Sequence, residues 1–551
     1  MKKIVFYTAL ATIVLVACKR KLVESQEQTA ESSLMAPMSL ITTPPDIKPL
    51  PVVYKEEFQA GNVHPGDHTQ HMLDLSYSES DPDRIYMAQD VSNIWVSRDF
   101  GLNWSNLKNQ GLHTNFMISV EADPLDKDRV LAAVQCRKYN TVDAGEQGIY
   151  LSLDGGITWQ KKKGRSKLGE VRSSTKLITY APTSKNQTLG YAKRWYAAFS
   201  EYKNTVNGDE MVADDGLLYS DNGGVDWTEV RKLPENVYGS KIRGVKVHTT
   251  KEDKVFIYGN GGLYRFEDAT NPAGAVTKIS GRYGGASGDL PEGDIWGHLY
   301  QSPNGKVLIV AVKGHGIYKS TNAASTWSLL YGWSDICYCY VNESFPDKIF
   351  AVPTQSSGEQ IKISDDGGST WHSPTKSDVT YRLGYDNSKW TKYLNGDFTY
   401  ILPDPRDVDK VFIHTKSKNF WSTDGGYTWN VSDNGFNGAS HCAPVQMFDP
   451  GNSSRFCYFM TDRSVVVTTN KGQWFKDANI IPANFGLSWK SAIAGALEPN
   501  GSAILACVGS GSGGKLLRSP DNGNTWSLVS DGNKSRWVIG FDLANPKYCY
   551  Q

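Results

Sequence analysis

The chain has 551 residues, with 58 Lys and Arg against 58 Asp and Glu and therefore no formal net charge. This length is enough for a large buried core, and the charge balance excludes a global electrostatic attraction to nucleic acid or to an anionic membrane surface. The 52 glycines, 16 tryptophans and 28 tyrosines favour a protein of tight turns and aromatic packing over a helical one.

Residues 1–18 have the pattern of an export signal. Two lysines precede an apolar run that is too short to span a membrane. The run ends in LVAC, which resembles the bacterial lipobox; this resemblance implies that Cys18 becomes the lipidated first residue. A plain membrane anchor and a signal cut elsewhere stay open. Residues 19–50 are polar, contain Pro and have no steady period, so they predict a flexible tether before a folded region at 51–551.

From about residue 70 onward, short apolar strands alternate with turn signals. A unit begins with an apolar strand that ends in an acidic or Pro-containing turn, as in ISVEADPLD and YILPDPRD. A strand of β-branched and aromatic residues follows, as in RVLAAV, and then a third strand such as GIYLS. Runs of this kind, with almost no 3.6-residue period, predict an antiparallel all-β fold.

An eight-residue motif follows the third strand and opens the fourth. Its eight variants are SRDFGLNW (97–104), SLDGGITW (152–159), SDNGGVDW (220–227), STNAASTW (320–327), SDDGGSTW (364–371), STDGGYTW (422–429), the shortened TTNKGQW (468–474) and SPDNGNTW (519–526). The long gap before the fourth copy leaves room for a unit without the motif at 255–269. We therefore expect nine units of about 40–60 residues, each with four short strands, and the start of a tenth at 537–551.

Every residue type in the motif has a local structural duty. The Asp or Asn side chain can accept backbone N–H bonds within its own turn, and the Gly pair permits positive φ. The Ser or Thr hydroxyl can tie the turn further, and the Trp can pack its large face beneath the hairpin. We therefore interpret the motif as scaffold and not as a site of chemistry.

The motif resembles the Asp-box, or BNR repeat, of β-propellers in sialidases, sortilin-type Vps10 domains and xyloglucanase-like glycoside hydrolases. This resemblance implies a propeller of four-stranded antiparallel blades with the motif at the periphery. One ring of nine or ten blades would resemble the sortilin arrangement, whereas seven blades and part of a second ring would resemble the xyloglucanases. A sialidase is disfavoured, because no Phe/Tyr-Arg-Ile-Pro segment precedes the first Asp-box.

The opening unit, SESDPDRIYMAQDVSNIWVSRDFGLNW (78–104), resembles the start of glycoside hydrolase family 74. The resemblance implies that Asp90 is a catalytic carboxylate, and a repeat alignment of YFMTDRSVVVTTNKGQW (458–474) puts Asp462 at the same position as the second one. Ser92-Asn93 and Arg463-Ser464 replace the family's Gly pair, which is a departure. Polar turn residues after the second strand are the alternative reading of both aspartates.

Three tryptophans outside the motif are candidate sugar platforms. Trp296, Trp333 and Trp390 lie in loop-like surroundings, where an exposed indole face can stack on the apolar face of a sugar; core or interblade packing is the alternative for each. Asp397 is a further candidate for substrate binding, with a plain turn aspartate as its alternative. The histidines of GNVHPGDHTQH (61–71) could hold a metal, but a solvated loop is favoured, so we expect neither metal nor organic cofactor.

The leading functional hypothesis is a lipid-anchored protein of the bacterial cell envelope, at the outer membrane or cell surface, that binds and hydrolyses a polysaccharide or oligosaccharide. An endo-acting, xyloglucanase-like mechanism with two carboxylates is the form the resemblance implies. A non-catalytic, sortilin-like propeller that binds protein or glycan is the first alternative, and a polysaccharide lyase is the second. The expected protein is a monomer that contacts the membrane through its lipid alone and does not bind nucleic acid.

Overall fold

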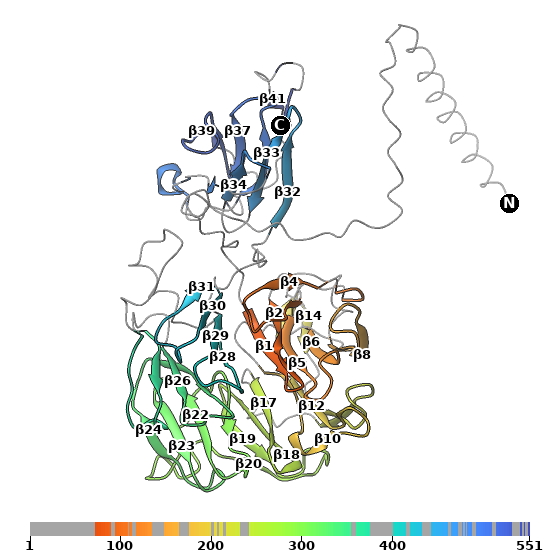
Figure 1. The fold of residues 1–551 in the computed structure, drawn as a ribbon, viewed down its shortest axis with the longest axis vertical. Coiled ribbons are helices and arrows are strands. Elements are labelled where there is room, and N and C mark those ends of the chain that lie inside the picture. Colours follow the sequence, from red (N-terminus) through yellow and green to blue (C-terminus); the bar gives the residue numbers. More distant parts are fainter. Residues whose placement is uncertain are drawn as a thin grey trace, which may run out of the picture. The chain divides into compact units, whose positions relative to one another are not determined.

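The described part of the chain is almost entirely β-structure (Figure 1). This computed structural model describes residues 72–550 except 90–93, 108, 113–116, 135–147, 165–175, 200–202, 207–208, 213–215, 232–241, 354–359, 375–399, 415–418, 432–441, 461–463, 472–475, 478–479, 481, 488–491, 510–513, 532–539, 543–544 and 546–548. By its internal contacts the chain divides into Met1–Ile47 and Lys48–Gln551. The expected signal, lipidated Cys18 and tether lie outside the described residues and stay predictions. Within those residues, no helix has the length and apolar character needed to cross a membrane.

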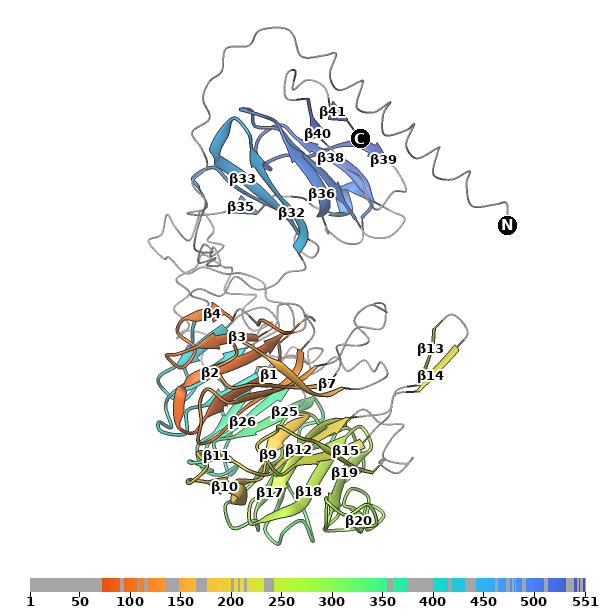
Figure 2. The ribbon, with the colours of Figure 1, turned by 90° about the vertical axis from the view of Figure 1, so that its right-hand side faces the viewer.

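The first three sheets follow the predicted four-strand unit. Their strands are β1 (Met72–Ser78), β2 (Asp81–Gln89), β3 (Ile94–Ser97) and β4 (Trp104–Asn106); β5 (Met117–Ala122), β6 (Val130–Val134), β7 (Gly148–Ser152) and β8 (Gln160–Gly164); and β9 (Ile178–Tyr180), β12 (Trp195–Phe199), β15 (Gly216–Ser220) and β16 (Thr228–Arg231). The third sheet carries a short helix and two inserted hairpins: η2 (Pro182–Ser184), β10 (Lys185–Asn186) with β11 (Tyr191–Ala192), and β13 (Lys203–Val206) with β14 (Asp209–Val212). Figure 2 shows the β13–β14 hairpin projecting from the other strands.

Four further sheets have the same order, although the sixth has three regular strands in its described part. They comprise β17 (Ile242–His248), β18 (Lys251–Gly259), β19 (Gly262–Phe266) and β20 (Val276–Lys278); β21 (Tyr300–Gln301), β22 (Leu308–Val312), β23 (Gly316–Ser320) and β24 (Ser328–Tyr331); β25 (Ile336–Val341), β26 (Ile349–Pro353) and β27 (Lys362–Ser364); and β28 (Tyr400–Pro403), β29 (Val411–His414), β30 (Asn419–Ser422) and β31 (Asn430–Val431). The unit predicted at 255–269 without a motif is the β18–β19 hairpin.

The remaining strands form two full sheets and the start of a third. They are β32 (Cys442–Asp449), β33 (Asn452–Met460), β34 (Ser464–Thr468) and β35 (Lys476–Asp477); β36 (Ala492–Leu497), β37 (Ile504–Val508), β38 (Lys515–Ser519) and β39 (Ser527–Asp531); and β40 (Gly540–Phe541) with β41 (Cys549–Tyr550); the short helix η5 (Pro482–Phe485) precedes β36. The expectation of nine units and the beginning of a tenth is therefore confirmed.

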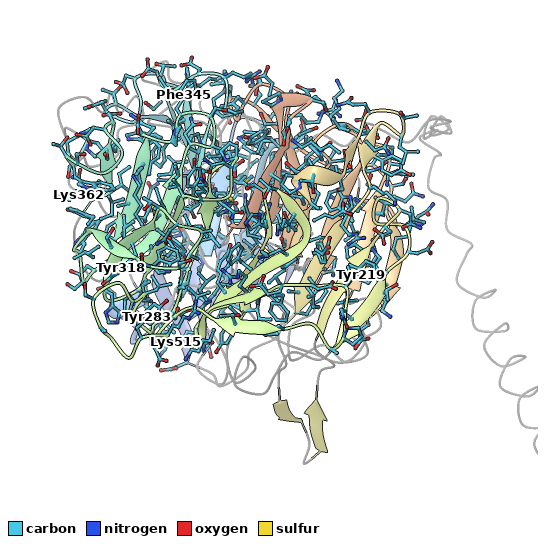
Figure 3. All side chains as sticks on the ribbon, turned by 90° about the horizontal axis from the view of Figure 1, so that it is seen from below. Tyr219, Tyr283, Tyr318, Phe345, Lys362 and Lys515 are labelled. Atoms are coloured by element: carbon cyan, nitrogen blue, oxygen red, sulfur yellow. The ribbon has the colours of Figure 1, made fainter. Side chains whose placement is uncertain are left out.

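The first seven sheets close into a ring. The seventh sheet lies against the first, because the Tyr400 hydroxyl donates to Asp74 Oδ1 at 3.1 Å and the rings of Trp104 and Phe412 lie 5.4 Å apart. A Cβ at Gly101, whose φ is +90°, would lie 2.4 Å from the Phe412 ring, so only glycine fits this closure. Of the two arrangements expected, the contacts support seven blades followed by further blades. Figure 3 views the ring from below, with Lys362 and Tyr219 on opposite sides.

Strand direction divides the ends of the blades into two faces. In an antiparallel sheet of four successive strands, the first and third turns lie at one end and the second turn lies at the other. The Asp-boxes between the third and fourth strands therefore define one face, which we call the Asp-box face. The opposite face, called the loop face, carries the connections between the second and third strands, such as residues 313–315 between β22 and β23.

The polar groups of the Asp-box form hydrogen bonds within its own turn. In the second sheet, the Ser152 hydroxyl donates to Asp154 Oδ1 at 2.8 Å and accepts from the Gly156 N–H at 2.8 Å. The two carboxylate oxygens of Asp154 accept from the N–H and hydroxyl of Thr158, at 2.8 and 2.6 Å, and the Trp159 indole donates to the Gly156 carbonyl. The interpretation of this motif as scaffold is confirmed, since its Ser, Asp, Thr and Trp side chains bond within their own turn here; in two other copies the indole N–H groups, of Trp327 and Trp429, have no partner among the described residues.

In several units, a basic residue directly before the apolar part of the second strand ties its blade to the next. Arg129 donates to the Gly223 carbonyl in the Asp-box of the following sheet at 2.6 Å, and Arg455 donates to Asn522 Oδ1 at 2.7 Å in the same way. The repeated position was not identified from the sequence. The basic residues at this position are Arg84, Arg129, Arg194, Lys254, Lys348, Lys410 and Arg455. Arg194 and Lys254 form their ion pairs within their own sheets, with Asp221 and Glu267.

We expect Ser422→Ala to lower the free energy of unfolding by about 1–3 kcal/mol, because two backbone donors in a buried turn lose their acceptor. The Ser422 hydroxyl accepts from the N–H groups of Gly426 and Asp424 at 2.8 and 3.2 Å and is fully buried. Denaturant unfolding measures the change. The matched control, Ser344→Ala at an exposed turn, should shift stability by less than about 0.5 kcal/mol. Equal effects of the two variants would contradict the scaffold assignment.

Candidate functional site

The two predicted catalytic aspartates belong to corresponding connections between second and third strands. Asp90 lies between β2 and β3, and Asp462 between β33 and β34; both are outside the described residues. In the first sheet, the end of β2 and the start of β3 that flank this connection are on the loop face, opposite the Asp-boxes. Trp390 and Asp397 fall in the segment 375–399 between β27 and β28, which is also outside the described residues. All four assignments stay predictions.

The pairing of the flanking strands gives a register for comparing the two connections. In the first sheet Ile85 pairs with Ser97, the first residue of its Asp-box. In the eighth sheet Phe456 pairs with Thr468, which has the same place in the shortened motif. Ile85 and Phe456 are therefore equivalent positions of their second strands.

Asp90 is five residues after Ile85, and Thr461 is five residues after Phe456, so Asp90 and Thr461 occupy equivalent positions. Asp462 comes one residue later. The repeat alignment that placed Asp462 on Asp90 is thus one residue out of register with the paired strands, because that alignment followed a shared Tyr and Asp and not the hydrogen-bond ladder. The catalytic role of Asp462 remains a prediction; Thr461, the residue level with Asp90, has no carboxyl group and cannot take that role.

Trp296 cannot act as a sugar platform, because the residue is buried. Only 7% of the residue is exposed. The Arg243 guanidinium carbon lies 3.9 Å from the ring centroid and Lys313 Nζ lies 4.1 Å from it. Both cations therefore lie close to the indole, and Tyr338 packs against it with ring centroids 5.7 Å apart. The Gly-rich surroundings suggested an exposed loop, whereas the segment lies between the fourth and fifth sheets.

Trp333 is half-buried on the connection from β24 to β25. Its ring meets the edge of Tyr331, with centroids 5.8 Å apart, and Lys362 Nζ lies 5.9 Å from its centroid. Tyr331 in turn stacks on Trp371 at 4.6 Å. Trp333 therefore takes part in interblade packing and keeps some exposed surface, so its role as a sugar platform stays a prediction.

Polar side chains from the first strands meet at the centre of the ring. Asp74, in β1, is fully buried and accepts from the Ser119 hydroxyl at 2.6 Å, the Val120 N–H at 2.9 Å and the Tyr400 hydroxyl. Lys176 places its ammonium 3.4 Å from both carboxylate oxygens of Asp74. Sheets one, two, three and seven are joined at this single carboxylate.

Lys176 also neutralises a second buried carboxylate. It pairs with Glu121 of β5, donates to the Val120 carbonyl at 2.9 Å and lies between two acids that have little access to water. The Ser76 hydroxyl donates to Glu121 Oε2 at 2.9 Å. One lysine thus serves two carboxylates, and its removal would leave both without their counter-ion.

Other axial contacts skip a blade and so must cross the centre. His298, just before β21, shares a hydrogen bond with Tyr400 of the seventh sheet, and Lys246 of β17 lies 3.0 Å from Glu343 beyond β25. The Tyr400–His298 pair does not suit a lyase, because Tyr400 is 1% exposed and a lyase base must reach its substrate. We name Asp74, Glu121, Lys176, His298 and Tyr400 the axial cluster.

Burial is the main cause of the unusual proton affinities in the axial cluster. Burial raises the pKa of Asp74 to about 6 despite the opposing pull of Lys176, and it raises the pKa of Glu121 in the same way. Burial and the charge of Lys176 lower the pKa of His298 to about 3, so its imidazole is neutral near pH 7. Burial and Asp74 raise the pKa of Tyr400 well above its usual value, which keeps the phenol protonated.

Relatives of this chain are found both by sequence and by structure. Residues 150–161 match the BNR/Asp-box repeat family model. A xyloglucanase from Paenibacillus sp. is 21% identical over 284 residues, which are 46% of this chain and 25% of that protein. The alignment therefore spans about a quarter of that relative's length.

The solved structures that resemble this chain include glycoside hydrolases of family GH74. A GH74 xyloglucanase from Xanthomonas campestris has a TM-score of 0.57 at 14% identity, over 86% of this chain and 75% of its own. A GH74 enzyme from Niastella koreensis has a TM-score of 0.55 at 14% identity, over 87% of this chain and 75% of its own. An ancestral GH74 enzyme has a TM-score of 0.58 at 13% identity, over 88% of this chain and 66% of its own. This chain shares the β-propeller fold of these structures.

We expect Asp74→Asn to change how stability depends on pH. A carboxyl whose folded pKa is raised stabilises the fold below its unfolded pKa of about 4, and this contribution is lost as the pH rises through the folded value of about 6. Asparagine does not titrate. Between pH 4 and 7 the wild type should therefore lose up to about 3 kcal/mol relative to the variant, as measured by urea unfolding at several pH values.

Glu121 and Lys176 face Asp74 from the neighbouring strands, and both are still present in this variant. Glu121→Gln therefore serves as the partner experiment, with a shift in the same direction because the pKa of Glu121 is also raised by burial. Parallel stability curves for the wild type and Asp74→Asn across this pH range would show that folding does not raise the pKa of Asp74.

The axial cluster was not found from the sequence. Its signal is weak but present: Asp74 is a single charged residue inside the apolar strand MLDLSYS. Glu121 stands in the equivalent position to Ser76 on the next unit, since Ser76 pairs with Tyr86 and Glu121 with Leu131. Aligning the first strands of all units by their pairing, and then selecting polar residues that should be buried, would have brought these side chains together.

Proposed function

We propose that this protein is a polysaccharide-degrading glycoside hydrolase that cleaves within the chain of its substrate, as a xyloglucanase does. The observation that carries the proposal is the β-propeller fold shared with GH74 enzymes over most of the chain, together with sequence similarity to a protein named as a xyloglucanase. Fold alone does not decide activity, so the proposal depends on the residues placed at the loop face.

In the proposed mechanism, Asp90 and a carboxylate on the equivalent connection of the eighth sheet act as a pair. One protonates the leaving glycosidic oxygen and the other activates water, with an expected separation of about 6.5–9.5 Å if the configuration inverts. Asp462 is the proposed partner of Asp90. The strand register supports testing Thr461 beside it, because Thr461 is the residue level with Asp90.

The proposed location is the bacterial cell envelope, with the protein held by lipid on Cys18 and acting as a monomer. The basic start, short apolar run and LVAC sequence support this proposal. Metabolic labelling with a fatty-acid analogue, in cells that express the full chain or its Cys18→Ser variant, is the test. Label that persists in the variant would reject lipidation at Cys18.

The decisive experiment for the activity is a screen of the purified full chain against plant and algal polysaccharides, read by new reducing ends and by product length. Internal cleavage into oligosaccharides is the expected result. Tight binding without new reducing ends would support the sortilin-like binding alternative, and products with an unsaturated uronate would identify a lyase.

A further inference from the structure

The Asp-box turn of the second sheet presents two exposed aliphatic side chains. Leu153 is 58% exposed and Ile157 is 44% exposed. In each of the other copies of the motif, at least one of the two equivalent positions holds a polar or charged residue. The motif itself therefore does not require these side chains, and exposing two aliphatic groups on one turn to water is unfavourable. A surface that covers them would remove this cost.

The strand that follows this turn is basic. β8 has the sequence QKKKG, in which Lys161 is exposed and Lys162 and Lys163 are partly exposed. Lys163 pairs with Ile149 and Lys161 pairs with Tyr150, so Lys162 is the extra residue of a β-bulge. Within the described part of the chain, neither Lys162 nor Lys163 forms an ion pair with a carboxylate. The charges of these two lysines are therefore not neutralised by the protein around them.

Protection of a sheet edge does not account for this run of lysines. Lysines on an outer strand hinder edge-to-edge aggregation. However, the outer strands β24 and β39 contain no lysine, and their residues Leu329, Leu528 and Val529 are 55%, 46% and 49% exposed. A chain that leaves those two edges apolar does not rely on lysine for this purpose, so the basic character of β8 has a separate reason.

A third exposed aliphatic side chain lies on the same face of the neighbouring sheet. Leu189 is 48% exposed and belongs to the turn between β10 and β11. The Ala192 N–H of this hairpin donates to Asp123 Oδ2, in the first turn of the second sheet, at 2.9 Å. Figure 2 shows this hairpin and the β13–β14 hairpin on opposite sides of the third sheet. The β10–β11 hairpin lies between the first and second strands of its sheet, so Leu189 is on the Asp-box face.

Aliphatic tips beside a run of lysines are the two features that a protein needs to lie on a membrane surface. The aliphatic groups enter the boundary between headgroups and acyl chains, and the lysines attract anionic headgroups. Lysine is a flexible point charge and suits a fluid layer of headgroups, whereas recognition of one fixed anion favours the planar fork of arginine. We propose that Leu153, Ile157 and Lys161–Lys163, with Leu189 beside them, form a docking surface for a bilayer that contains anionic phospholipid.

Docking by the Asp-box face points the loop face away from the bilayer. β2 ends and β3 begins on the loop face, so this side of the ring stays open to a polysaccharide in solution. β1 also begins there, and residues 19–71 separate it from the expected lipid on Cys18. These residues span on the order of 170 Å when extended, against about 30 Å for a nine-residue strand such as β2. The lipid can therefore reach the same bilayer, and the docking surface adds a second membrane contact to it.

The test maps which residues of the full chain touch lipid. The chain is bound to vesicles of phosphatidylcholine alone and to vesicles that also contain phosphatidylglycerol, each with a trace of photoactivatable phosphatidylcholine. Crosslinked residues are identified by mass spectrometry, and the yield is expressed per bound protein, so attachment by the N-terminal segment does not enter the comparison. Crosslinks at residues 150–164 and 185–192 should be at least about tenfold more frequent on the anionic vesicles, and this excess should fall as the salt concentration rises.

Two variants with the same loss of charge separate this surface from the rest of the Asp-box face. The triple variant Lys161→Gln, Lys162→Gln and Lys163→Gln should lose the excess on anionic vesicles. The control variant Lys251→Gln, Lys306→Gln and Lys319→Gln, near the Asp-box ends of the fourth and fifth sheets, should retain it. Thermal unfolding confirms that both variants are folded.

Equal crosslinking of these residues on the two kinds of vesicle, or an equal loss in both variants, would overturn the docking surface. If the vesicles give equal yields and the wild type, but not the Lys161–Lys163 variant, is retained on an immobilised acidic polysaccharide, the partner is a glycan and the membrane assignment is wrong. No step of the experiment measures cleavage of a polysaccharide, so its outcome is independent of the proposed hydrolase activity.

Discussion

Asp90→Asn in the full chain is expected to lower polysaccharide cleavage by at least about 100-fold, because the amide can neither hold nor release the proton that a general acid or base transfers. The affected quantity is kcat, since the amide keeps the size and hydrogen-bonding capacity of the side chain. Initial rates of reducing-end release on the substrate identified by the screen measure the effect, and thermal unfolding confirms that the variant is folded.

The matched control for Asp90 is Asp347→Asn, an exposed carboxylate on the Asp-box face of the sixth sheet, and its rate should equal that of the wild type. The same assay on Asp462→Asn and Thr461→Ala separates the two readings of the eighth sheet. If Asp462 is the second carboxylate, its variant loses activity as strongly as Asp90→Asn and Thr461→Ala does not. Wild-type rates in Asp90→Asn would remove the two-carboxylate proposal.

Lys176→Met should lower the free energy of unfolding at neutral pH by about 3–5 kcal/mol, the cost of removing one partner from a buried ion pair. The ammonium lies 3.4 Å from Asp74 and also pairs with Glu121, and both carboxylates are at least nine-tenths buried. Methionine keeps most of the side-chain length, so lost packing contributes little. Denaturant unfolding at pH 7 gives the value.

Two further measurements distinguish lost charge from general damage. Because burial raises the pKa of Asp74 and of Glu121, both carboxyls take up protons readily as the pH falls, and the penalty of Lys176→Met should shrink near pH 5. Adding Asp74→Asn to Lys176→Met should recover part of the stability. Lys193→Met, at an exposed lysine of the third sheet, is the control and should change stability by less than about 0.5 kcal/mol. A penalty that is independent of pH would contradict the charge argument.

The four-strand blade unit and its Asp-box turn could be predicted from the sequence because the interactions that form them are local. The Asp-box hydrogen bonds join residues two to four positions apart, as between Ser152 and Gly156 or between Asp154 and Thr158. Residues this close in the chain meet in any fold that contains the turn. The period-two strands, the nine units and even the unit without a motif therefore followed from the amino-acid order alone.

The repeat pattern did not predict which residues of distant units occupy equivalent positions in their strands. The alignment of Asp462 with Asp90 followed similar letters, and the strand pairing instead brings Thr461 level with Asp90. In the same way, Trp296 lay in a Gly-rich segment that was interpreted as exposed, but it is buried, and Arg243 of β17 and Lys313 of the β22–β23 turn lie against its ring. The composition of a segment indicates how flexible its backbone is, but it does not predict which side chains from elsewhere in the chain pack against it.

The sequence by itself determined an all-β chain of repeated four-strand units with scaffold turns, since each of these depends on neighbours within a few residues. The tertiary structure decided that seven units close into a ring and that Asp74 meets Lys176 and Tyr400 at its centre. Closure depends on the angle between successive sheets, which is set by side chains that meet only after the strands have paired. The same packing supplies the burial that raises the proton affinity of Asp74.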